Sequence, residues 1–129
     1  NIYQCLEQGF PTNRQQVCLE VPGDRNYSWA DLESGVARFA NLLCSLQLEP
    51  GARVAVQVEK SVEALMLYLA TVRAGYVYLP LNTAYREAEV DYFLGDAEPA
   101  VVITSSKNVE TVTASARRAG AAHVFTLDE

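Results

Sequence analysis

The stretch "RVAVQVEKSVEALMLYLATVRAGYVYLPL", residues 53–81, decides the fold. Residues 53–58 alternate in polarity with a period of two and are rich in valine, which is typical of a β-strand. Ser61 supplies an N-cap for a helix over 62–74, and residues 76–79 form a second short strand. A strand, a helix and a strand in this order predict a parallel pair joined by a right-handed crossover. Because the helix is apolar on nearly all sides, we expect it to be covered on more than one face.

The same alternation continues towards the C-terminus. A helix of about nine residues starts at Arg86 and ends at Gly95, and a third strand covers 100–104. Ser105 or Ser106 then caps a fourth helix that runs through Arg118, and the sequence places a fourth strand at 123–127. The fold class predicted is therefore α/β, a parallel sheet with helices on both faces.

A β-hairpin and a long amphipathic helix precede this unit. Residues 17–29 contain strand, turn and strand signals. Ser28 and Asp31 have the spacing of a capping box, and the following helix ends before Pro50. Its apolar face combines Trp29, Leu32, Val36, Phe39, Ala40, Leu43 and Leu46 at helical spacing, and we expect Cys44 to be part of the core beside them.

Composition excludes several functional classes. The 129 residues carry a net charge of −6, which argues against a nucleic-acid partner, and no apolar run is long enough for a membrane span. We see no secretion signal, and three widely spaced cysteines indicate reduced thiols and a cytoplasmic location. Glu87 and Asp91 share a helix face without a second acidic cluster, so we expect a solvated face and no metal site. His123 opens a predicted strand, and we expect it to be structural.

Three polar segments follow predicted strands, where ligands bind in open α/β sheets. They are "EKS" (59–61), "PLNTAY" (80–85) and "TSSK" (104–107). Pro80 cannot donate to a ladder, so we expect it to end the pairing of its strand. The segment 104–107 is open to two interpretations: a helix N-terminus that attracts an anion, or two capping serines beside a solvated lysine. The sequence contains neither a P-loop nor a GxGxxG fingerprint.

Residues 27–103, from "YSWADLESGVARFANLL" through "GARVAVQ", "LATVRAG", "YLPLN" and "DAEPAVVI", resemble the N-terminal part of AMP-forming acyl-CoA synthetases. Within this superfamily of adenylate-forming enzymes, "EKSVEALMLYLATVRAGYVYLPLNTAY" and "EVDYFLGDAEPAVVI" most resemble malonyl-CoA synthetases. The resemblance extends from about Val17 to Val124. It identifies the family by pattern, because none of these stretches carries out the reaction.

The resemblance implies that the parent enzyme uses ATP and Mg²⁺ to convert a small carboxylate into an acyl-adenylate, then transfers the acyl group to coenzyme A. It implies cofactor-binding roles for Asn82 and Thr83, near the pantetheine arm of coenzyme A, and for Lys107, near its nucleotide phosphate. Asn108 follows Lys107 where relatives often have further basic residues. The resemblance places no catalytic residue and no metal ligand in this chain.

We therefore expect residues 1–129 to be an incomplete N-terminal segment of the large adenylate-forming domain, with a hairpin at 17–29 and an alternating region at 28–127. No helix follows the last predicted strand to cover the sheet. The segment should be inactive alone, bind none of the cofactors tightly, and associate with the remainder of its polypeptide or with itself. Two alternatives are another short-chain or fatty acyl-CoA ligase, and a non-catalytic α/β binding or interaction module.

Overall fold

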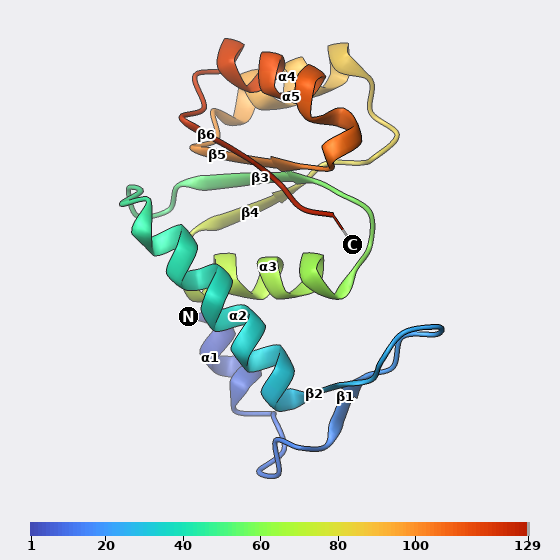
Figure 1. Cartoon of the computed structure of the whole chain (residues 1–129). Coiled ribbons are helices and arrows are strands. Elements are labelled where there is room, and N and C mark those ends of the chain that lie inside the picture. Colours follow the sequence, from blue (N-terminus) through green and yellow to red (C-terminus); the bar gives the residue numbers. More distant parts are fainter. Residues whose placement is uncertain (129) are drawn as a thin grey trace.

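A computed structural model describes residues 1–128, which form a two-stranded antiparallel sheet and a four-stranded parallel sheet of order β4-β3-β5-β6 (Figure 1). The elements are α1 (Ile2–Glu7), β1 (Val17–Leu19), β2 (Tyr27–Ser28), α2 (Trp29–Ser45), β3 (Arg53–Gln57), α3 (Val62–Arg73), β4 (Val77–Pro80), α4 (Glu87–Ala97), β5 (Val101–Thr104), a 3₁₀ turn η1 (Ser106–Asn108), α5 (Val109–Arg118) and β6 (His123–Thr126).

Helices cover both faces of the parallel sheet, with α2 and α3 on one side and α4 and α5 on the other (Figure 1). The alternation of side chains along the strands explains this arrangement. The face towards α2 and α3 buries Val54, Val56, Val101 and Ile103 with Leu43 and Leu67. The opposite face buries Ala55 and Val102 with Leu81, Val90, Leu94, Val112 and Ala116. These two layers confirm the predicted fold class.

A short N-terminal helix, α1, is an element that the sequence patterns did not reveal. The ring of Tyr3 is buried in a third cluster together with side chains of α2 and α3. The amide of Asn1 accepts a hydrogen bond from the Tyr3 N–H at 2.8 Å and donates to the carbonyl oxygen of Val72 at 3.1 Å. Helix α3 therefore contacts α1, α2 and the sheet, as its apolar circumference predicts.

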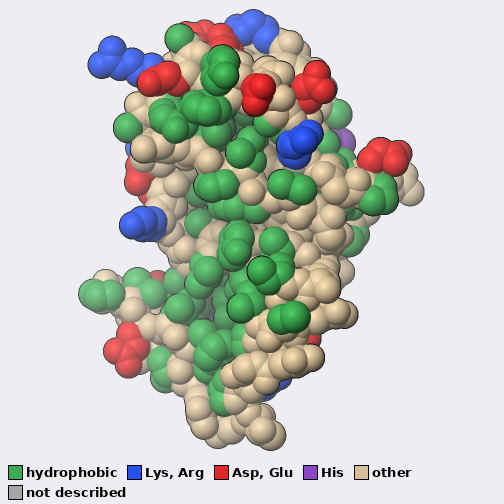
Figure 2. Space-filling model, turned by 180° about the vertical axis from the view of Figure 1, so that it is seen from behind, with side chains coloured by type: hydrophobic (Ala, Val, Ile, Leu, Met, Phe, Trp, Pro, Cys, Tyr) green, Lys and Arg blue, Asp and Glu red, His purple; other side chains and the backbone are tan. Residues whose placement is uncertain are grey.

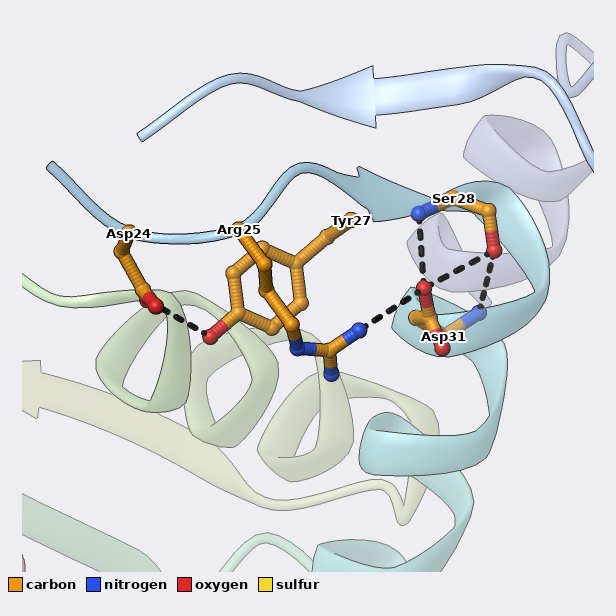
Figure 3. Close-up of polar contacts among 5 residues, drawn as sticks. All are labelled: Asp24, Arg25, Tyr27, Ser28 and Asp31. Atoms are coloured by element: carbon orange, nitrogen blue, oxygen red, sulfur yellow. Dashed lines mark hydrogen bonds and ion pairs between the residues drawn. The ribbon is translucent and has the colours of Figure 1, made fainter. Parts of the chain in front are cut away.

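The predicted capping box at the start of α2 is confirmed (Figure 3). The carboxylate of Asp31 accepts from the Ser28 N–H at 2.8 Å, and the Asp31 N–H donates to Ser28 Oγ at 3.1 Å. The Arg25 guanidinium approaches the same carboxylate at 3.4 Å and stacks over the ring of Tyr27. The hairpin return and the helix start are thus held as one local unit.

Helix α4 extends past the predicted stop at Gly95. It ends at Ala97, and the left-handed residue is Glu98, with φ 48°. Leu94 is fully buried, and its carbonyl accepts the Glu98 N–H at 2.9 Å. Because Pro99 follows, residue 98 cannot continue the helix comfortably, so the stop comes from the proline and not from the glycine.

Strand β4 ends at Pro80, as predicted, and Val56 with Pro80 is the last pair of its register with β3. The next N–H, that of Leu81, donates to the Val56 carbonyl at 2.8 Å. In a parallel ladder, alternate N–H groups point to one neighbour, so the position of Pro80 faces away from β3. Strand β4 is at the edge of the described sheet, where a missing donor leaves no bond unmade.

Two further local predictions need correction. Neither Ser105 nor Ser106 caps α5 with its side chain, because η1 comes first and the Ser106 hydroxyl is held by the Asp128 carboxylate. Cys44 is exposed and not part of the core. Leu43, one residue earlier, takes the buried position, and the helical turn of about 100° per residue carries Cys44 outwards.

Candidate functional site

The carboxyl ends of β3, β4, β5 and β6 meet at one edge of the sheet (Figure 1). All four strands are parallel, so the segments that leave them at this edge are neighbours: residues 58–61, 81–86, 105–108 and 127–128. This edge is where open α/β sheets bind ligands. It brings together the three segments that the sequence singled out.

The turn after β4 presents Asn82 and Thr83 on the surface. Both side chains are exposed, and the Asn82 carboxamide oxygen accepts the Ala84 N–H at 2.9 Å. That bond is the one by which asparagine closes a turn on its own backbone. Part of the hydrogen-bonding capacity of Asn82 is therefore used within the turn.

Lys107 lies on the other side of the same edge, in η1. Its ammonium is 3.8 Å from the Glu59 carboxylate, and both side chains are mostly exposed. Next to it, Asp128 accepts from the Ser106 N–H at 2.8 Å. The hydrogen bonds from the Ser106 hydroxyl and N–H lower the pKa of the Asp128 carboxyl. The turn after β5 is thereby tied to the chain that leaves β6.

Two hollows follow this edge and share Val58 and Glu59 as a common wall. One, of about 540 Å³, is lined by Asn82 and Thr83 with Lys60 and Leu81. The other, of about 260 Å³, is lined by Lys107 and Asp128 with Ser61, Ser105 and Leu127. The structure brings the three predicted binding residues to one edge, on either side of Glu59, and does not join them in a single pocket.

The hollow around Lys107 does not fit the phosphates of a nucleoside triphosphate. Its lining places two carboxylates, those of Glu59 and Asp128, against one ammonium. Among residues 1–128, the Ser105 hydroxyl beside it is buried with no hydrogen-bond partner, and so is that of Thr104. These hydroxyls offer neutral hydrogen-bonding groups, and the described residues alone supply too little positive charge for three phosphates.

Sequence reasoning missed two side chains at this edge. Gln57 ends β3 and is 3 % exposed, and its carboxamide nitrogen donates to the Asn82 carbonyl at 2.9 Å. The signal was available, because the period of two places Gln57 on the same sheet face as Ala55, which is buried. Asp128 was missed as well, because no local pattern links it to Ser106. His123 starts β6 and therefore lies at the opposite edge of the sheet.

A further hollow, of about 460 Å³, lies away from this edge. It is lined by α2, α3 and the end of the hairpin, with Arg25 (Figure 3), Tyr27, Gly35, Arg38, Glu63 and Met66 among its side chains. None of the four segments that leave the parallel strands lines this hollow. Of the elements that follow those strands, only α3 contributes to it. Its position gives it no part in the strand-end site.

Comparison with known proteins identifies the family. Residues 7–128 match the family described as AMP-binding enzyme. The chain belongs to the AMP-binding enzyme family. This AMP-binding chain is 32% identical over 104 residues to a probable CoA ligase, CCL9, of Humulus lupulus, covering 81% of the chain and 20% of that protein. It is 31% identical over 116 residues to the oxalate–CoA ligase of Arabidopsis thaliana, covering 89% and 22%.

Among solved structures, ATP-bound MatB from Rhodopseudomonas palustris superimposes with a TM-score of 0.91 and 45% identity. The match covers 98% of the AMP-binding chain and 25% of the MatB chain. The resemblance to AMP-forming acyl-CoA synthetases is therefore confirmed, and the chain spans about a quarter or less of the lengths of these relatives. Within residues 1–128, no helix combines the length and apolarity needed to cross a membrane.

Proposed function

We propose that this chain is the N-terminal segment of the large domain of a malonyl-CoA synthetase. The parent enzyme activates malonate with ATP to malonyl-adenylate and pyrophosphate, then transfers the malonyl group to coenzyme A. The observation that carries the proposal is the match of nearly the whole chain to ATP-bound MatB at 45% identity. The stretches that resemble malonyl-CoA synthetases lie inside that match. We place the binding of ATP, Mg²⁺ and malonate on residues outside this chain.

The role proposed for the chain is to contribute one wall of the coenzyme A site. Asn82 and Thr83 border the hollow that takes the pantetheine arm, and Lys107 lies on the nucleotide side. The ammonium of Lys107 can attract a phosphate, while Glu59 at 3.8 Å weakens that attraction. Among residues 1–128 we assign no group that activates a carboxylate. We infer that the isolated segment is inactive.

The exchange of ATP with labelled pyrophosphate by the full-length polypeptide tests the substrate. Malonate should support the fastest exchange when compared with methylmalonate, acetate, oxalate and a fatty acid. Oxalate is included because a curated relative is an oxalate–CoA ligase. Exchange that depends on a fatty acid and ignores malonate would remove the malonate assignment and leave the acyl-CoA ligase alternative.

A second measurement separates an enzyme segment from a self-sufficient module. Residues 1–129 are purified alone and assayed for acyl-adenylate with ATP and each carboxylate, and no product is expected. Product formed by these residues alone contradicts the proposal.

The three cysteines are free in the described residues, which supports a reducing cytoplasmic compartment for the parent enzyme.

A further inference from the structure

Gln57 is a polar side chain buried at the last position of β3. Its exposure is 3 %, and Thr104, its Cα partner on β5, is fully buried. Burying a carboxamide costs free energy unless its polar atoms find partners. An apolar residue such as Ala55, two positions earlier on the same face, would be the cheaper choice for a core position.

The carboxamide of Gln57 connects β3 to both ends of the turn that carries Asn82 and Thr83. Its nitrogen donates to the Asn82 carbonyl at 2.9 Å and to the Tyr85 carbonyl at 3.4 Å. Within the turn, the Tyr85 N–H donates to the Asn82 carbonyl at 3.1 Å. The residues between these two anchors are exposed. Gln57 therefore helps to set where the turn lies relative to the end of β3.

The position of this turn determines one wall of the larger strand-end hollow. Asn82 and Thr83 form one side of it, and Val58 and Glu59, which directly follow Gln57, form the other. The hydrogen bonds of Gln57 help to fix the width between these walls, together with the bond from the Leu81 N–H to the Val56 carbonyl at the start of the turn. Displacements of about 1 Å at such positions are enough to change rates strongly.

We propose that Gln57 is a positioning residue for the thiol substrate. It holds the turn so that Asn82 and Thr83 meet the pantetheine arm of coenzyme A, and it contributes nothing to adenylate formation. This inference rests on the proposed function. To the proposed function it adds a residue that contacts neither the carboxylate nor coenzyme A but affects the affinity for coenzyme A.

The test uses the full-length enzyme with the substitution Gln57→Met, which preserves length and removes the amide. The matched control is Thr71→Val on α3. It also removes a buried hydrogen bond, from Thr71 Oγ1 to the Leu67 carbonyl at 2.8 Å, but at the end of α3 far from the strand-end site. For each variant, ATP–pyrophosphate exchange is measured beside the KM for coenzyme A and for pantetheine.

For Gln57→Met, the KM for both thiols should rise about five- to tenfold, as expected for one or two lost hydrogen bonds. Exchange should stay within about twofold of the unchanged enzyme, and Thr71→Val should leave both KM values unchanged. If Gln57→Met loses exchange as well, Gln57→Asn is compared, because it keeps the amide and shortens the reach. Loss of exchange by both variants, or an unchanged KM, overturns the inference.

The failure of this inference is distinguishable from the failure of the proposed function. If the unchanged enzyme shows no exchange with any carboxylate, the proposed function is wrong. If it exchanges normally and Gln57→Met leaves the KM for both thiols unchanged, only the role of Gln57 is wrong.

Discussion

Met66 of α3 occupies the space that a side chain at Gly35 of α2 would need. A Cβ at position 35 would lie 2.8 Å from Met66 Cε, and closer still to Sδ. Met66 is 6 % exposed and belongs to the cluster between α1, α2 and α3. Glycine at this position permits the close approach of the two helices that cover one face of the sheet.

Gly35→Ala should therefore destabilise the fold despite the better helix propensity of alanine. Overpacking costs about 1–3 kcal/mol and the propensity returns about 1 kcal/mol, so we expect a net loss of up to about 2 kcal/mol. In a Met66→Ala background the space is free, and the same substitution should stabilise by about 1 kcal/mol. Urea unfolding monitored by the fluorescence of Trp29, the single tryptophan, measures both. Destabilisation of similar size in both backgrounds would contradict the contact.

The stability of the chain should fall at acidic pH, in part through Asp31. The hydrogen bonds from the Ser28 N–H and hydroxyl lower the pKa of its carboxyl below the usual value, and Arg25 adds to the effect. Because the pKa is lower in the folded state, the stabilisation is present above the unfolded value of about 4 and is lost as the pH falls through the folded one.

Urea midpoints between pH 6 and pH 2.5 test this. The unchanged chain should lose more stability over this range than Asp31→Asn, whose side chain does not ionise. Asp96→Asn, on the exposed side of α4, is the control and should follow the unchanged chain. Parallel curves for Asp31→Asn and the unchanged chain would count against a role for the ionised carboxylate.

Because Lys107 pairs with Glu59, substitutions of the two residues should change the KM for coenzyme A in opposite directions. In the full-length enzyme, Lys107→Met should raise the KM for coenzyme A about two- to fivefold, since an exposed charge contact is worth little. Glu59→Gln removes the carboxylate 3.8 Å away and should lower this KM. Neither change should alter the KM for pantetheine, which lacks the nucleotide phosphates. Equal effects on both thiols would place Lys107 away from the phosphates.

The isolated chain should associate with itself through the side of β4. Figure 2 shows hydrophobic side chains gathered over the middle and lower part of the rear face, while most charged ones lie towards the end where Figure 1 has α4 and α5. Tyr68 is 36 % and Val77 47 % exposed, and the ring of Tyr68 contacts that of Tyr78. Apolar patches of this kind promote association.

Light scattering over a range of concentrations measures this. The mass of the unchanged chain should increase with concentration, and Val77→Lys should reduce the increase, because a lysine on an edge strand opposes pairing. Tyr92→Lys removes the most exposed aromatic ring, on α4, and should have little effect. A mass that stays monomeric at all concentrations would show that this surface does not associate.

Strong local periodicity explains which parts of the fold could be predicted. Residues 53–81 combine a period of two with a helical pattern and a cap, so each local signal agrees with the next. Helix α1 could not be predicted, because it buries little more than Tyr3 and depends on hydrogen bonds from Asn1 to the distant end of α3. The stop of α4 was misplaced because a glycine was given more weight than the proline after it.

At the site, the order of strands and helices along the chain predicted which edge of the sheet carries the candidate residues. It did not predict the side-chain contacts that they make there. Parallel strands bring their carboxyl ends together whatever the side chains, which is why Asn82 and Lys107 could be assigned to one edge. The bond between Ser106 and Asp128 joins residues 22 positions apart, and the proximity of Glu59 to Lys107 depends on how two turns pack. Such pairings are set by tertiary structure and leave no periodic trace in the sequence.

Pro80 determines how the sheet can grow. A further strand that pairs with the free side of β4 could use the N–H of Tyr78 but would find no donor at Pro80. Sheet extension on that side must therefore stop one residue pair before the end of β4. Backbone pairing by an added strand can therefore proceed only up to the proline. The turn with Asn82, which follows it, is left free of such pairing and open to a small molecule.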